Sequence, residues 1–165
     1  MDRIKKTVLL AMMSAVALAL SFLESQIPTF IAIPGVKLGL ANIAVIFVLY
    51  KLGAKEAFAV SFVRLIAVFL LFGGVMPLIY SIAGALLSLC VMLILKGLPT
   101  FSEIGVSVAG GVAHNIAQVL VAVFLLDSSA IFLYLPALLL SGTVAGVVIG
   151  IISAILVKRV KIKTL

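Results

Sequence analysis

Long apolar stretches, separated by short segments that carry most of the charge, dominate this sequence. Uncharged stretches cover residues 7–23, 38–50, 77–95, 104–126 and 131–157, and a further apolar stretch, 57–76, contains one charged residue, Arg64. A membrane-spanning helix needs about 20 apolar residues. The pattern therefore predicts an all-α integral membrane protein, a bundle of six transmembrane helices that keeps Arg64 inside the membrane.

The composition agrees with this fold class. Of the 165 residues, 65% are hydrophobic and 10% are charged, which is too little polar surface to keep a folded chain dispersed in water. Six spans with short connections use nearly all of this length. Residues 1–165 are therefore expected to form a single membrane domain.

The basic residues predict the orientation in the membrane. If the N-terminus is cytoplasmic, ten of the twelve lie on the cytoplasmic side: Arg3, Lys5, Lys6, Lys51, Lys55, Lys96, Lys158, Arg159, Lys161 and Lys163. Cytoplasmic loops carry an excess of Lys and Arg, so both termini are expected in the cytoplasm. The net charge of +7 does not indicate nucleic-acid binding, because the basic residues are spread between the apolar runs and not clustered on one surface. At those positions they can bind anionic lipid headgroups.

The second apolar stretch is too short to cross a membrane comfortably. Thirteen residues form a helix of about 20 Å, whereas the hydrocarbon core is about 30 Å thick. The segment before it is broken by Pro28, Pro34 and Gly35, so it cannot be a regular helix throughout. We expect this segment, 25–36, to fold back over the bundle as a capping loop; the alternative is a loop in the headgroup region.

Small residues recur every four positions in the first and last stretches. Ala11, Ala15 and Ala19 form one stripe, and Gly142, Gly146 and Gly150 form another. Small-xxx-small faces let helix backbones approach closely in lipid. For the glycine stripe we expect packing within the bundle, whereas for the alanine stripe docking to a separate partner competes with internal packing.

Several polar residues are predicted to lie at membrane depth. Arg64 lies about eight residues from each end of its stretch, roughly 12 Å from either surface, and its planar fork suits a carboxylate or phosphate. The fifth stretch places His114 at a similar depth, with Asn115 and Gln118 nearby. Because ionisable groups inside a membrane are costly, they mark functional sites by default. The predicted ligand-binding residues are Glu24, Lys37, Asn42, Arg64, His114, Asn115 and Gln118.

A purely structural role is the alternative for these side chains. Arg64 would pair with Glu24 or with helix carbonyls, and the polar residues of the fifth stretch would form hydrogen bonds between helices. No catalytic residue, metal site or cofactor is predicted, because the five acids are scattered and no carboxylate pair for metal and diphosphate is present. The chain also lacks a nucleotide-binding P-loop, so ATP-driven work would require partner subunits.

Four segments carry a family resemblance: PGVKLGLANI, GAKEAFAVSFVRLIAVFLLFGG, FSEIGVSVAGGVAHNIAQVLVA and YLPALLLSGTVAGVVIGIISAIL. They resemble the bacterial membrane family labelled Gx transporter, also catalogued as heptaprenyl diphosphate synthase component I. That family is similar to the substrate-binding S components of energy-coupling factor transporters. The resemblance implies six helices, a capping first outer loop, and an AxxxA motif, here Ala11 to Ala15, that docks a transmembrane coupling subunit.

Two functions follow from the residues and the resemblance. The first is a substrate-binding subunit in the bacterial cytoplasmic membrane that works with a coupling subunit and ATPase subunits. Its ligand would be a small anionic, isoprenoid, quinone or flavin-like molecule. The second is a non-catalytic accessory or scaffold subunit of a prenyl diphosphate, quinone or extracellular electron-transfer system. The synthase label is not expected to mean that this chain is an enzyme.

Overall fold

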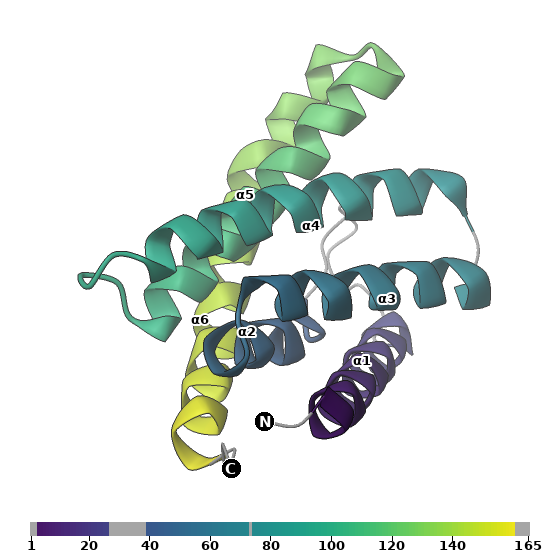
Figure 1. Ribbon diagram of the computed structural model, residues 1–165. Helices are drawn as coiled ribbons and strands as arrows, with labels where there is room; N and C mark the ends of the chain where they lie inside the picture. Colours follow the sequence, from purple (N-terminus) through teal and green to yellow (C-terminus); the bar gives the residue numbers. More distant parts are fainter. Residues whose placement is uncertain (1–2, 27–38, 73, 161–165) are drawn as a thin grey trace.

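The computed structural model describes residues 3–26, 39–72 and 74–160, which are helical with short connections (Figure 1). The predicted all-α class is confirmed for these residues. The elements are α1 (Arg3–Gln26), α2 (Asn42–Lys51), α3 (Ala54–Phe72), α4 (Val75–Lys96), α5 (Glu103–Leu126), the 3-10 helix η1 (Ser129–Tyr134) and α6 (Leu135–Arg159).

Four of the helical segments are long and apolar enough to cross a membrane: α1, α4, α5 and the continuous stretch Ser129–Arg159 formed by η1 and α6. The chain is thus a multi-pass membrane protein. The six predicted helices are present, but two do not qualify as spans by length and composition alone. α2 has ten residues, and α3 carries Lys55, Glu56 and Arg64.

Several predicted boundaries were wrong. The second helix begins at Asn42 instead of residue 38, and the sixth begins at Leu135, after η1, instead of residue 131. α1 continues to Gln26, so Ser25 and Gln26 belong to a helix and not to the predicted capping loop. The rest of that loop, 27–36, lies outside the described residues. The third stretch was expected to reach residue 76, but α3 ends at Phe72 and α4 begins at Val75. Gly74 has φ of 101°, which only glycine adopts readily, whereas Pro77 sits in the first helical turn, where its missing N–H costs nothing.

The short helix α2 lies at the centre of the protein. Every residue from Ile43 to Leu49 is buried, and α2 packs against α1, α3 and α6. Its ends are held by side chains of other helices. The backbone N–H of Gly39, just before α2, donates to Glu24 Oε1 (2.5 Å), and Lys96 Nζ donates to the Leu49 carbonyl (2.6 Å). A carboxylate at the N-terminus and a cation at the C-terminus both complement the helix dipole.

The glycine stripe of α6 packs directly against the backbone of α5. A Cβ atom added at Gly146 would lie 2.7 Å from Val108 Cα, and one at Gly150 would lie 2.8 Å from Ile104 Cα. Gly142 faces the backbone of Gly111 in the same way. The predicted use of this stripe for packing within the bundle is confirmed, and the side-by-side course of α5 and α6 is visible in Figure 1.

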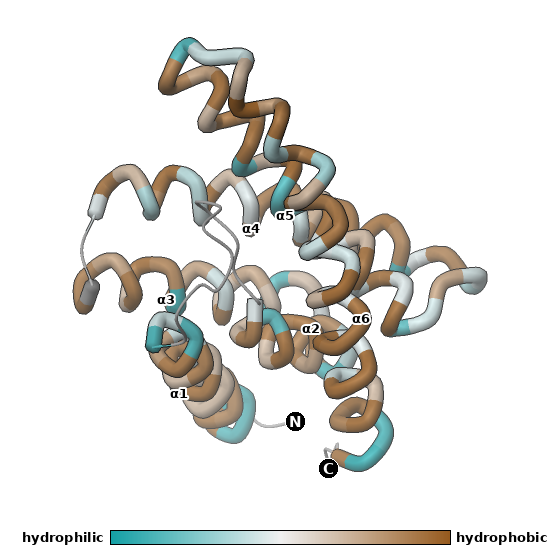
Figure 2. The backbone as a smooth tube through the Cα atoms, turned by 180° about the vertical axis from the view of Figure 1, so that it is seen from behind, coloured by the Kyte–Doolittle hydropathy of each residue, from teal (hydrophilic) through white to brown (hydrophobic). Residues whose placement is uncertain are grey.

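The alanine stripe of α1 points outward instead. Ala17 is the buried residue of this helix, whereas Ala11, Ala15 and Ala19 are exposed together with the apolar side chains around them. Large apolar residues are also exposed elsewhere, for example Leu70 (75%) and Phe124 (85%). Figure 2 shows that hydrophobic positions make up most of the length of the helices. Such a surface suits a lipid solvent.

Candidate functional site

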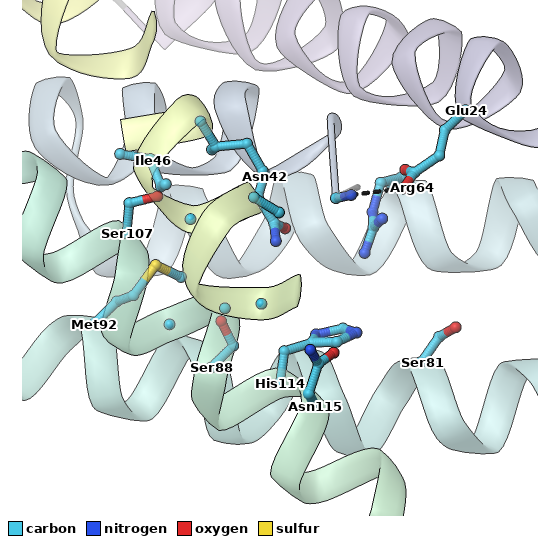
Figure 3. A pocket seen from close by; sticks show the side chains of 17 residues that line it. Glu24, Asn42, Ile46, Arg64, Ser81, Ser88, Met92, Ser107, His114 and Asn115 are labelled. Carbon is cyan, nitrogen blue, oxygen red and sulfur yellow. Dashed lines mark hydrogen bonds between the residues drawn. The ribbon is translucent and has the colours of Figure 1, made fainter. Parts of the chain in front are cut away.

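A cavity of about 60 Å³ lies between the helices (Figure 3). All six α-helices contribute to its lining, so the site forms only when the whole chain is folded. Its polar lining residues are Glu24, Asn42, Arg64, Ser81, Ser88, Ser107, His114 and Asn115. Glycines of α5 and α6 complete the wall.

Five of the seven predicted ligand-binding residues line this cavity. Glu24 comes from the last turns of α1, Asn42 from the first turn of α2, Arg64 from the middle of α3, and His114 and Asn115 from the middle of α5. They are separated by up to 91 positions in the sequence, yet their side chains face one space. Their role in ligand binding stays a prediction.

The other two predicted residues are Gln118 and Lys37. Gln118 is half-buried one turn beyond His114, and it does not contribute to the wall. Lys37 lies outside the described residues.

Among the described lining residues, Arg64 is the one with a permanently charged cationic side chain. Its Nε atom is buried and has no hydrogen-bond partner. Glu24 faces Arg64 in Figure 3 and attracts it electrostatically, but among the described residues the two form no salt bridge. One oxygen of Glu24 instead accepts the hydrogen bond from Gly39 N–H. The structural alternative was that Arg64 pairs with Glu24 or with helix carbonyls. Among the described residues Glu24 attracts Arg64 without forming a salt bridge.

His114 and Asn115 have different surroundings although they are neighbours in sequence. The His114 ring packs closely against α4, since a Cβ atom added at Gly84 would lie 2.6 Å from its Cε1 atom. Asn115 is buried, and its Nδ2 atom donates a 2.6 Å hydrogen bond to the carbonyl of Leu138 in α6. Asn115 thus connects two helices, which is the structural role considered as the alternative.

The sequence prediction missed the contribution of α4. Ser81 and Ser88 both line the cavity, with Gly84 between them making room for His114. Their spacing of three and four residues puts them on one helix face, and this small polar face was the available signal. It was overlooked because isolated serines and glycines are ordinary in membrane helices.

The cavity lies within the part of the chain that matches a known family. A family model described as heptaprenyl diphosphate synthase component I matches residues 13–156. Searches of curated proteins and of solved structures gave no match. The matched region includes every described residue of the cavity lining, and the family agrees with the one predicted from the four resembling segments. This chain therefore belongs to the heptaprenyl diphosphate synthase component I family.

Proposed function

We propose that this chain is a membrane-embedded subunit that binds a small polar ligand in the cavity between its helices. The observation that carries the proposal is the convergence of Glu24, Asn42, Arg64 and His114, from four different helices, on one space. Polar and ionisable groups at membrane depth are costly and gather where a ligand or ion must be held. Packing alone would not require an arginine whose Nε atom lacks a hydrogen-bond partner.

The proposed topology has all six helices in the bacterial cytoplasmic membrane, as one membrane domain with both termini in the cytoplasm. α2 is enclosed by protein, so its short length leaves no backbone exposed to lipid. Lys6 in α1 forms an ion pair with Glu56 at the start of α3. This contact supports a topology in which α1 and α3 begin on the same side of the membrane.

As in S components of energy-coupling factor transporters, docking to a transmembrane coupling subunit is proposed to occur through α1. The exposed positions of Ala11 and Ala15 support this, because small residues that face outward allow close approach of another helix. ATPase subunits would then supply the energy. The direct test is co-purification of such subunits with the wild-type chain and their loss with Ala11→Phe.

The second candidate is an accessory subunit of a prenyl diphosphate synthase. The family description favours it, because "component I" names one part of an assembly with at least one other component. The described residues hold no group of three His, Cys, Asp or Glu side chains that could bind a metal ion. In this reading the membrane helices would anchor a partner that performs the chemistry.

Native mass spectrometry of the protein purified from its own membrane separates the two functions. Ligand binding predicts a small molecule that is retained by the wild-type chain and lost from Arg64→Met. Arg159→Met, an exposed arginine at the end of α6, is the matched control and should retain the molecule. A chain that carries a synthase subunit and no small molecule would reject ligand binding in favour of the accessory role.

A further inference from the structure

The cavity lies between two groups of helices. We call α1, α2 and α3 the N-terminal half and α4, α5 and α6 the C-terminal half. In the C-terminal half α5 packs against both α4 and α6, and in the N-terminal half the three helices pack on one another. The halves are in contact through α2 with α6 and through α3 with α4. Each half supplies lining residues, so a ligand in the cavity touches both.

From the N-terminal half, Arg64 reaches the cavity with an unsatisfied donor. Its Nε atom is buried and has no hydrogen-bond partner among the described residues, and one oxygen of Glu24 accepts from the backbone N–H of Gly39. In a guanidinium, Nε–H and one Nη–H point in parallel and match two oxygens of a carboxylate or phosphate. The unsatisfied donor therefore favours a ligand that carries negatively charged oxygen atoms, an oxyanion.

From the C-terminal half, the His114 ring is held against the cavity wall. A Cβ atom added at Gly84 of α4 would lie 2.6 Å from its Cε1, 2.7 Å from its Nε2 and 2.8 Å from its Nδ1. Because these three distances are nearly equal, this end of the ring lies face-on over Gly84. The ring nitrogens are therefore directed along the surface of α4 and not into it. An imidazole carries at least one N–H donor in either protonation state.

The two side chains face the same space. In Figure 3, Arg64 extends from α3 toward the side of the cavity where His114 lies, and Glu24 lies on the opposite side of Arg64. Ser81 and Ser88 line the cavity on the face of α4 that holds the His114 ring, and their hydroxyl groups can also donate to anionic oxygen. Donors from both halves thus surround the space between Arg64 and His114.

We infer that the cavity binds an oxyanion, a carboxylate or phosphate group, between Arg64 of the N-terminal half and His114 of the C-terminal half. This inference rests on the proposed ligand-binding function and adds the chemical class of the ligand and the pair of residues that holds it. The bound group connects the two halves at the cavity. Gly84 is a positioning residue, because it leaves room for the His114 ring at the wall.

The test uses inorganic phosphate and acetate as separate probes, and the full-length protein purified in a maltoside detergent without phospholipid. Sodium chloride at equal ionic strength is the control. The chain has one histidine, His114, and three arginines, of which Arg3 and Arg159 are exposed. ¹⁵N labelling of both residue types therefore isolates the site in an NMR spectrum. At least one probe should shift the Arg64 Nε–H signal and the His114 ring signals with one shared dissociation constant, and should leave Arg3 and Arg159 as in chloride.

Variants test the bridge between the halves. Arg64→Met should abolish the shift of the His114 ring, because the anion is no longer held, whereas Arg159→Met should keep it. Gly84→Ala should weaken binding of the probe about tenfold, as expected for one hydrogen bond to a charged group, because the new Cβ displaces the ring. Gly105→Ala in α5 makes an ordinary 3.4 Å contact and should bind the probe as the wild type does.

A shift of Arg64 without a shift of His114 would overturn the bridge between the halves. Absence of both shifts with either probe would overturn the oxyanion class, whereas the small molecule retained in native mass spectrometry tests ligand binding independently. The wild-type spectra decide both points even if a variant fails to fold.

The same chemistry is present in a soluble anion and in a phospholipid headgroup. Phosphatidylglycerol added to the probe-loaded protein distinguishes these two sources. Displacement of the probe from Arg64 and His114 would support the inference with a lipid headgroup as the oxyanion, and undisturbed binding would support it with a soluble ligand.

Discussion

Lys96 Nζ, at the end of α4, donates a 2.6 Å hydrogen bond to the carbonyl oxygen of Leu49 in α2 and lies 5.2 Å from the centre of the Tyr50 ring. The last carbonyl groups of a helix have no partner within the helix. α2 is short and buried, and its Leu49 carbonyl oxygen accepts a hydrogen bond from the side chain of another helix. In soluble proteins a water molecule can donate to such a carbonyl. The central helix is thus attached to α4 by its C-terminal end.

Lys96→Met should therefore destabilise the protein by about 1–2 kcal/mol, because a hydrogen bond from a charged donor is lost at a part-buried carbonyl. The change keeps the apolar stem and removes the ammonium group. Thermal unfolding in detergent, followed by circular dichroism, measures the effect. Lys158→Met removes an exposed charge at the end of α6 and should leave the midpoint unchanged. Equal midpoints for both variants would contradict the attachment of α2.

Gly146→Ala should cost about 1–3 kcal/mol, because the new Cβ would lie 2.7 Å from Val108 Cα and would push α5 and α6 apart. Gly105→Ala in α5 is the control. Its Cβ would meet Phe101 at an ordinary 3.4 Å, so alanine should be neutral or slightly stabilising there through its better helix propensity. Unfolding midpoints of the two variants give the comparison, and a stable Gly146→Ala would show that the two helices separate easily.

Arg64→Met should lose the bound ligand without losing stability. A buried charge without full compensation destabilises a fold, and an apolar side chain of similar length removes this cost. We expect the variant to be as stable as the wild type or more stable, by up to about 3 kcal/mol. Unfolding measured beside ligand retention checks both parts. A large loss of stability would assign Arg64 to the scaffold of the bundle.

The orientation of the helices can be tested by cysteine labelling. After replacement of Cys90, the single cysteine, new cysteines report the two sides of the membrane: at Lys55 near the start of α3, at Ser128 before η1, and at Lys158 near the end of α6. A membrane-impermeant maleimide should label the Ser128 position in intact cells. The positions of Lys55 and Lys158 should react only after the membrane is opened, because both lie on the predicted cytoplasmic side. Labelling of all three in intact cells would reject the proposed topology.

The helices and the cavity were accessible to sequence reasoning to different extents. Apolar runs predicted each of the six α-helices among the described residues, whereas the 3-10 helix η1 was not predicted. The end of α3 was not predicted, because the boundary was placed just before Pro77, whereas the chain turns at Gly74. The depth of Arg64 and His114 along their helices placed them at one level, which is why both line the cavity.

What the sequence could not reveal was the rotation of one helix against another. Asn115 and His114 are adjacent, but Asn115 bonds to the carbonyl of Leu138 while His114 packs against Gly84. These contacts depend on how α5 is turned between α4 and α6, which no spacing within α5 encodes. The rotation of α5 also decides which of its polar residues line the cavity, so Gln118 was included although it is not in the described lining.

The enclosure of α2 also bears on how the chain is made. Helices enter the bilayer from the ribosome-bound channel in sequence order, and a ten-residue helix is too short to remain there alone. α2 leaves the channel before α6, the last of the helices that surround it, has been synthesised. The packing around α2 therefore stays incomplete until α6 has been made. In a chain that terminates before α6, the side of α2 that contacts α6 would be exposed to quality-control proteases.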